Sequence, residues 1–564
     1  MGMLADIYRK SGEDYRDFVS DKLIFSFCFM GNIKYSRHIF IFPFQWDYID
    51  SSSSEKESIP YARRTDLDAF DRLFTKVSPL KRRYFEIGAS VGHYSEYVYF
   101  HSFARKALYG TKENRSIYFY ELEVEGGRYC IDINTGSLSK TYDLKLESIS
   151  LHAFNTGVGV ISFSLYNDEY VDEEDILRIN DFGRRLYPQF MTSDNRLEAK
   201  SRFLANCISG SIGDIHFHDD FSQFEQSIDH TDIFLPPDHI RQVFGYKPTD
   251  RLGDSWCKFV FRDRDEDSGR IRISPVMDDR MYFLSYFQNK DLVKSLKEDK
   301  KYFSKREKIR SKLGSSPGMG YAYEVGKKKD FWYRYLFGDG LFRGVENEQM
   351  QLEEIRRSSY ARWIEYGTLI GITKDSAVYA TSWEILEEHF MSMYYQMAIL
   401  CLVQRASVLR FSGEISYLTS QIRRGKRKVG TNIKELYGNY IRFLNELYFR
   451  EVTSQIQGME MYEMFQKNMN IERDTKGLEG EMKELFSYLD IDEQSKLNRI
   501  ASLYLPLGVW TGVLGINTFA KGGIFSKLFD NASSTQWVAG DLVTLLVMAL
   551  CLFVPIWYRL IHKK

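Results

Sequence analysis

The 564-residue sequence predicts an α/β domain followed by long α-helices and two transmembrane helices. Three observations support this fold class. Apolar and polar residues alternate between positions 117 and 165, as they do in antiparallel strands. No proline occurs between Pro317 and Pro506, which favours helix over that stretch. Two uncharged segments, Ile500–Ala520 and Leu542–Tyr558, are each long enough to cross a bilayer.

The first predicted domain covers residues 1–380 and is an α/β domain that we expect to sense a ligand. Gly126-Gly127, Asn134-Thr135-Gly136 and Asn155-Thr156-Gly157 interrupt the alternating pattern and predict the turns of an antiparallel meander. We expect a sheet of roughly four strands there. A helix is predicted from Glu173 to about Tyr187, where Pro188 ends it.

The second predicted domain, residues 381–496, is a cytoplasmic helical hairpin and stalk. Thr381 and Glu384 form a capping-box pattern that predicts the start of a long helix. Apolar residues then recur at steps of three and four, and the same spacing returns between Ile433 and Leu447 after a basic loop. A third helix is predicted from about Gly480 to Asn517. The third domain, residues 497–564, holds both transmembrane helices.

Composition limits the classes of function. A net charge of −1 gives no sign of direct nucleic-acid binding. The six cysteines are scattered without a CxxC pattern, which argues against a disulfide framework or a cysteine-ligated metal. Lys496 and Arg499 precede the first span and Arg559 follows the second, so both termini are predicted to be cytoplasmic. We therefore expect a multi-pass protein of the bacterial inner membrane.

A family resemblance follows from the first span. Pro506, Gly512 and the tripeptide Gly515-Ile516-Asn517, with one more span before the C-terminus, resemble the CorA family of divalent-cation channels. The usual tripeptide there is Gly-Met-Asn, and Gly-Ile-Asn also occurs in a zinc-transporting branch. The resemblance covers about residues 381–564. It implies a homopentamer embedded in membrane lipids, with magnesium or zinc as the permeant ion.

The resemblance also implies roles for residues of the last helix. A ring of Asn517 amides would accept hydrogen bonds from the waters on magnesium. Small residues recur on the same helix face, which fits either a pore lining or a helix-packing seam. The predicted selectivity residues are Gly515, Ile516 and Asn517, and the predicted pore-lining residues are Leu497, Asn498, Leu505, Gly508 and Gly512.

Two clusters in the α/β domain are candidate ligand-binding residues. Arg184 and Arg185 could clamp a phosphate, although a pair of arginines at a helix end is also ordinary. His216 and His218 lie two residues apart, on one side of a strand, and Asp219 follows. That spacing suits a metal or a polar ligand, or simply a solvated strand end.

The size of the first domain shapes the predicted function. Some CorA-like proteins with enlarged domains accompany type III CRISPR systems, where a nucleotide second messenger, SAM-AMP, is thought to open them. The resemblance implies a membrane effector of this kind, gated by SAM-AMP, without enzymatic activity. One alternative is a housekeeping magnesium or zinc transporter. Another is a membrane-tethered, metal-dependent hydrolase that uses His216, His218 and Asp219.

Overall fold

The computed structural model of the chain describes two compact units, which comprise residues 1–426 with 435–479 and residues 427–434 with 480–564. The residues that it describes are 34–49, 65–136, 138–187, 190–191, 197–198, 204–221, 237–245, 259–262, 270–276, 280–297, 321–423 and 429–517.

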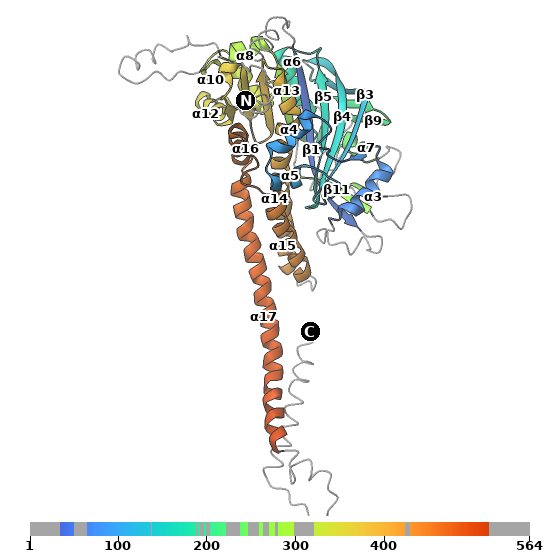
Figure 1. Cartoon of the computed structure of the whole chain (residues 1–564), viewed down its shortest axis with the longest axis vertical. Helices are drawn as coiled ribbons and strands as arrows, with labels where there is room; N and C mark the ends of the chain where they lie inside the picture. The colour runs from blue at the N-terminus through green and yellow to red at the C-terminus, as the bar shows by residue number, and fades with distance from the viewer. Residues whose placement is uncertain are drawn as a thin grey trace, which may run out of the picture. The chain divides into compact units, whose positions relative to one another are not determined.

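The first unit is built on one sheet of thirteen strands, in which β1, β5, β4 and β3 run side by side (Figure 1). The hydrogen-bonded order is β13-β14-β15-β12-β1-β5-β4-β3-β8-β9, while β2 pairs with β3, and β11 pairs with β1 and β10. All neighbours are antiparallel except β12 and β15. The strands are β1 Tyr35–Ile49, β2 Lys81–Arg83, β3 Ile117–Asn134, β4 Ser139–Phe154, β5 Val158–Asn167, β8 Cys207–Ile212, β9 Ile215–Asp220, β10 Phe259–Arg262, β11 Arg270–Pro275, β12 Tyr282–Gln288, β13 Ser359–Tyr360, β14 Thr368–Ile372 and β15 Ser376–Thr381. A separate pair joins β6 Phe190–Met191 to β7 Leu197–Glu198.

Helices pack on the sheet and continue beyond it in the chain (Figure 1). Before β12 they are α3 Leu67–Val77, α4 Val91–Tyr99, α5 Ser102–Leu108, α6 Glu173–Arg184 and α7 Asp238–Val243. After β12 they are α8 Lys290–Lys297, α10 Ala322–Val325, α11 Lys329–Phe337, α12 Glu348–Ser358, the 3-10 helix η3 Ile364–Tyr366, α13 Ile385–His389, the π-helix η4 Phe390–Tyr394, α14 Tyr395–Arg423, α15 Val429–Glu446, α16 Ile456–Asn468 and α17 Ile471–Asn517.

Strand β1 lies at the centre of the core and is buried on both faces. Phe40 and Phe42 belong to the main apolar cluster, which also contains Phe182 of α6. Ile39 and Ile41 alternate with them and are equally buried, and α14 packs against β1 and β5. Complete burial of each such side chain contributes about 1.5–3 kcal/mol.

The predicted antiparallel meander is confirmed by β3, β4 and β5. Gly136 and Gly157 adopt left-handed φ values of 81° and 75° after β3 and β4, as the turns require. Gly126 instead lies within β3, where the pairing with β4 shifts between Glu123 and Gly127. The predicted sheet of about four strands is wrong, because strands from distant parts of the chain join both sides of the meander.

The helical region also differs in detail from the prediction. Helices α14 and α15 do pack together, since the Phe411 ring lies 5.9 Å from that of Tyr440 and 5.7 Å from that of Phe443. Thr381 is not a helix cap, because it is the last residue of β15 and its Oγ1 accepts a hydrogen bond from the Trp383 N–H. The final helix, α17, begins at Ile471 rather than near Gly480.

The membrane prediction is contradicted. In the part of the chain that the structure describes, no helix is both long and apolar enough to cross a bilayer. This finding overturns the predicted pair of transmembrane helices, the homopentameric membrane channel and the multi-pass inner-membrane location with cytoplasmic termini. The second predicted span, Leu542–Tyr558, lies outside the described residues.

The physical reason lies in the last turns of α17. The helix carries charge as far as Arg499, and its uncharged part, Ile500–Asn517, has 18 residues, at the short end of the ~17–25 that a spanning helix needs. A hydrocarbon core is ~30 Å thick. The stretch also contains Ser502, Pro506 and Gly508, which are uncharged without being strongly apolar. The lack of charged residues in this stretch therefore does not by itself make the helix apolar enough to span a bilayer.

The predicted pore residues lie in the same helix. Leu497 and Leu505 are exposed on α17, as are Asn498 and Gly508. Asn517 is the last residue of the helix. Gly512, Gly515 and Ile516 belong to its final turns. A pore lining requires spanning helices, so we do not carry these residues into a proposed function.

Candidate functional site

The candidate site lies at the C-terminal end of α6. Acidic residues occupy the first turn of this helix and Arg184 occupies the last, an arrangement that the helix dipole favours. Ile176 and Phe182 are completely buried. Gly183 allows a close approach to β1, because a Cβ at this position would lie 2.4 Å from the ring of Phe40. Helix α6 therefore holds Arg184 firmly over the sheet.

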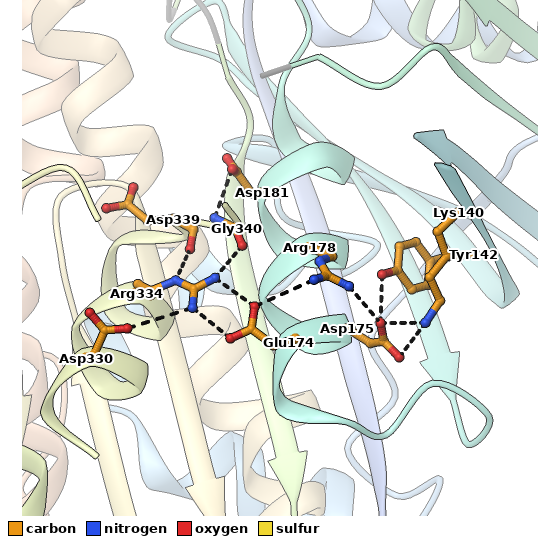
Figure 2. A network of polar contacts seen from close by, with 10 residues as sticks. All are labelled: Lys140, Tyr142, Glu174, Asp175, Arg178, Asp181, Asp330, Arg334, Asp339 and Gly340. Atoms are coloured by element: carbon orange, nitrogen blue, oxygen red, sulfur yellow. Dashed lines mark hydrogen bonds and ion pairs between the residues drawn. The ribbon is translucent and has the colours of Figure 1, made fainter. Parts of the chain in front are cut away.

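A network of charged contacts joins α6 to α11 and to the turn that follows α11 (Figure 2). Arg334 donates hydrogen bonds of 2.7 and 2.9 Å to the two carboxylate oxygens of Glu174. The same guanidinium donates to the carbonyl oxygens of Asp339, at 3.1 Å, and of Gly340. Asp181 accepts a 2.9 Å hydrogen bond from the Gly340 N–H. Both the helix and the turn are thereby tied to α6.

The network continues toward β4 (Figure 2). Lys140 donates to both oxygens of Asp175, at 2.7 and 2.8 Å, and the Tyr142 hydroxyl donates to one of them at 2.8 Å. Arg178 lies 3.6 Å from Asp175 and 3.9 Å from Glu174. The Asp175 carboxylate is well supplied with donors, so this end of the network serves to hold α6 in place.

The turn from Phe337 to Gly344 is held by polar contacts within it and with the neighbouring helices. Gly338 ends α11 in the left-handed conformation, with φ 62°. Asp339 accepts a 2.7 Å hydrogen bond from the Gly344 N–H, and burial raises the pKa of the Asp339 carboxyl. The turn is compact, and much of its main chain is held by side chains from α6 and α11.

Arg184 lies beneath this turn. Its side chain is buried, with 1% of the residue exposed. One nitrogen, Nη2, donates to the carbonyl oxygens of Phe337, at 2.6 Å, and Gly338, at 3.0 Å. The guanidinium carbon lies 5.1 Å from the centre of the Phe283 ring. The other two nitrogens, Nε and Nη1, have no hydrogen-bond partner.

The surroundings of Arg184 disfavour its positive charge. Burial lowers the pKa of Arg184 to about 10. Asp181 and Asp375 oppose this shift, whereas the charges of Arg280 and Arg185 add to it. Asp181 is already engaged, because it accepts a 2.6 Å hydrogen bond from Arg185. Asp339 adds a third carboxylate on which the Arg184 charge acts, so what distinguishes Arg184 is its two nitrogens without acceptors and not an excess of positive charge.

The sequence predicted part of this cluster. Arg184 and Arg185 were candidate phosphate contacts, and the structure adds Arg280, which pairs with Arg185 through a main-chain bridge. Nothing in the local sequence marks Arg280, because it meets the end of α6 through an isolated bridge between two segments 95 residues apart in the chain. The carbonyl groups of Phe337 and Gly338 were equally out of reach of sequence reasoning.

A hollow lies against α11 and the residues that follow it. Its volume is about 550 Å³, and it is lined by Asp330, Arg334, Leu341, Phe342, Arg343 and Glu346. The Phe342 side chain is prominent there, with 63% of the residue exposed. Hollows of this size accommodate ligands as large as a nucleotide. The turn thus separates a buried arginine from an open hollow with an aromatic side chain.

The second predicted cluster lies elsewhere, on β9. His216 and His218 are exposed, whereas Asp219 is buried. Asp219 accepts hydrogen bonds from the main-chain N–H groups of Asp238, at 2.9 Å, and His239, at 3.1 Å, and it also contacts the His239 ring. Its structural role is to hold the start of α7. The Arg184 and Asp219 side chains bind different segments and form no common site by these contacts.

The described residues also offer no metal centre at β9. His218 Nδ1 lies 3.4 Å from the Cys207 sulfur, and the main-chain N–H of His218 donates to the Gln242 side-chain oxygen. Within the described ranges, no group of three or more His, Cys, Asp or Glu side chains is arranged to hold a metal ion. Comparisons with protein-family models, with curated proteins and with solved structures found no match to this chain.

Proposed function

We propose that the sheet domain is a sensor that binds a phosphate-bearing ligand at Arg184. The ligand class that we favour is a nucleotide second messenger such as SAM-AMP, which the resemblance implies. One observation carries the proposal. Arg184 is a buried guanidinium with two nitrogens that lack acceptors, next to two further arginines.

The energetic argument rests on those unfilled hydrogen bonds. A buried donor without an acceptor costs about 1–3 kcal/mol, and more when it is charged. Phosphate oxygens accept from guanidinium groups in pairs, and such charge-assisted bonds are about twice as strong as neutral ones. A bound phosphate would therefore supply the acceptors that Nε and Nη1 lack.

The turn after α11 lies where ligand binding at Arg184 would change its conformation. A Cβ built on Gly338 would lie 2.8 Å from the guanidinium carbon of Arg184, so the turn closes over the arginine. Because Arg184 is buried, a phosphate can reach Nε and Nη1 only if the residues that cover them, the turn among them, move aside. Ligand binding would thus favour a displaced turn, by the difference in affinity between the two states.

The proposal is one of ligand binding, without a catalytic role. The housekeeping transporter requires spanning helices, and the finding on α17 contradicts them. The hydrolase requires a metal, for which the described part of β9 supplies no set of three ligands. The homopentamer belongs to the channel interpretation and is not part of this proposal.

Ligand-dependent unfolding of the full chain tests the proposal. SAM-AMP, AMP and inorganic phosphate would each be added during thermal denaturation of the wild type, of Arg184→Gln and of Arg357→Gln, whose arginine is exposed on α12. A ligand present at 100 times its Kd stabilises by about 2.7 kcal/mol. We expect this shift in the wild type and in Arg357→Gln, and its loss in Arg184→Gln. An equal shift in Arg184→Gln would refute the site, and no shift with any ligand would refute the proposed ligand class.

A further inference from the structure

Helix α4 has an unusual polarity for a helix that packs on a protein core. Its one buried residue is a glutamate, Glu96. Val91 and Tyr94 of the same helix are 84% and 54% exposed. A helix usually turns its apolar residues inward and its charged residues outward. A carboxyl group therefore lies in the interface that attaches α4 to the domain, together with the rings of Tyr97 and Tyr99.

The partners of Glu96 are neutral. The Tyr109 hydroxyl donates to Glu96 Oε1 at 3.2 Å, and the Gln396 side chain of α14 also bonds to the carboxyl. No cation appears among the groups that act on Glu96, and burial raises its pKa to about 7. An ionised carboxylate would thus be buried without a counter-charge, which is costly.

Gln396 provides a second, independent observation. Its Oε1 atom is buried and has no hydrogen-bond partner. A protonated Glu96 carries an O–H donor, which an ionised one lacks, and an amide oxygen is a suitable acceptor for it. Protonation of Glu96 would therefore both remove the buried charge and supply the donor that Gln396 needs after rotation of its amide.

The other charged and titratable groups near α4 must be distinguished from Glu96, and several of them have identified contacts. Arg105 lies 4.4 Å from the ring centre of Tyr97 and donates to the Phe100 carbonyl. The His93 ring packs on that of Phe85. Titratable groups on the described elements near α4 include Tyr99 of α4 itself, Glu388 and His389 of α13 and Tyr394 of η4. Among these, Glu388 lies near Gly92 at the exposed start of α4.

We propose that Glu96 is a proton-operated latch, which keeps α4 docked against η4 and α14 when it is protonated and releases the helix when it ionises. The latch does not depend on the ligand site at Arg184. Helix α4 contacts the π-helix η4, and such one-turn irregularities are frequent at functional positions. Release would free a segment whose Val91 and Tyr94 side chains are already exposed.

Hydrogen exchange measured by mass spectrometry on the full chain tests the latch. Because a docked pKa near 7 exceeds the ordinary value of 4.5, docking weakens as pH rises between these values and levels off above them. We expect the protection of α4 amides, corrected for intrinsic exchange, to fall about tenfold per pH unit from pH 5.5 to 7. In Glu96→Gln the protection should stay constant over this range, and in Glu388→Gln it should follow the wild type.

Peptides from β3, β4 and β5 report whether each variant is folded. If Glu96→Gln loses protection in these strands, Glu96→Asp replaces it, and we expect its fall in α4 protection to occur at a different pH from that of the wild type. A wild-type protein whose α4 protection does not change with pH would overturn the latch. The same pH dependence in Glu96→Gln as in the wild type would also overturn it.

Discussion

At the scale of single residues, the buried arginines differ in how well they are satisfied. Arg272 is buried beside Asp47 and donates to it at 2.7 and 2.6 Å. Arg334 has the carboxylate of Glu174 in the same bidentate arrangement. Arg184 donates to two main-chain carbonyl oxygens, and two of its nitrogens have no acceptor. A buried donor without an acceptor calls for an explanation, and a bound ligand would provide one for Arg184.

The unsatisfied state of Arg184 predicts how its removal affects stability. In the absence of ligand, Arg184→Met should leave the free energy of unfolding within about 1 kcal/mol of the wild type or raise it, because a buried charge with missing partners is replaced by a side chain of similar length. Arg272→Met is the matched control and should lose about 3–5 kcal/mol, since it strands the buried carboxylate of Asp47. Denaturant unfolding measures both. Equal losses in the two variants would show that Arg184 is an ordinary structural arginine.

At the scale of elements, the turn after α11 depends on a glycine. Gly338→Ala should lower the free energy of unfolding by about 1–3 kcal/mol, because φ is 62° there and the new Cβ would meet the Arg184 guanidinium. Gly413 offers a control within α14, where a Cβ would meet no atom within 4 Å. Gly413→Ala should be neutral or stabilising by up to about 1 kcal/mol. Similar effects of the two substitutions in thermal unfolding would contradict the assigned role of the turn.

Sequence reasoning succeeded where the signal is local. The alternation between Ile117 and Leu165 and the glycines at positions 136 and 157 predicted β3 to β5. The helix predicted from Glu173 is α6, although it ends at Arg184 rather than near Tyr187. These features need only nearest neighbours and turn chemistry, which the amino-acid order carries directly.

It failed where partners are distant in the chain. The acceptors of Arg184 lie in Phe337 and Gly338, and the partner that explains Asp219 is the start of α7. Glu96 has no local signal, because its partner Gln396 in α14 lies 300 residues away in the chain. The transmembrane prediction is wrong for a different reason, which is that it rests on the length of an uncharged run and not on the hydropathy of the helix that contains it.

At the scale of the whole molecule, buried titratable groups act on stability in opposite directions. Burial lowers the pKa of His38 to about 4 and that of His152 to about 3. Their contribution to stability is present above the ordinary pKa of 6.5 and is lost as pH falls. Burial raises the pKa of Glu96 from 4.5 to about 7, so its contribution is present below 4.5 and is lost as pH rises to 7.

Because these contributions oppose each other, the effect of Glu96 is best measured as the difference in free energy of unfolding between the wild type and Glu96→Gln. Between pH 4.5 and 7, the free energy of unfolding of Glu96→Gln should rise relative to that of the wild type by up to roughly 3 kcal/mol, at 1.36 kcal/mol per unit of pKa shift. Denaturant titrations of both proteins at pH 4.5, 5.5, 6.5 and 7.5 measure this difference. Parallel profiles would mean that Glu96 titrates normally in the folded protein.

The central claim is that Arg184 binds the phosphate of a nucleotide ligand. Isothermal titration of SAM-AMP into the full chain, with the wild type, Arg184→Met and Arg184→Lys compared at one ionic strength, tests it most directly. We predict saturable binding by the wild type, a loss of at least about tenfold in affinity for Arg184→Met, which corresponds to about 1.4 kcal/mol, and partial recovery with lysine. Wild-type affinity in Arg184→Met, or no binding by a folded wild-type protein, would contradict the account.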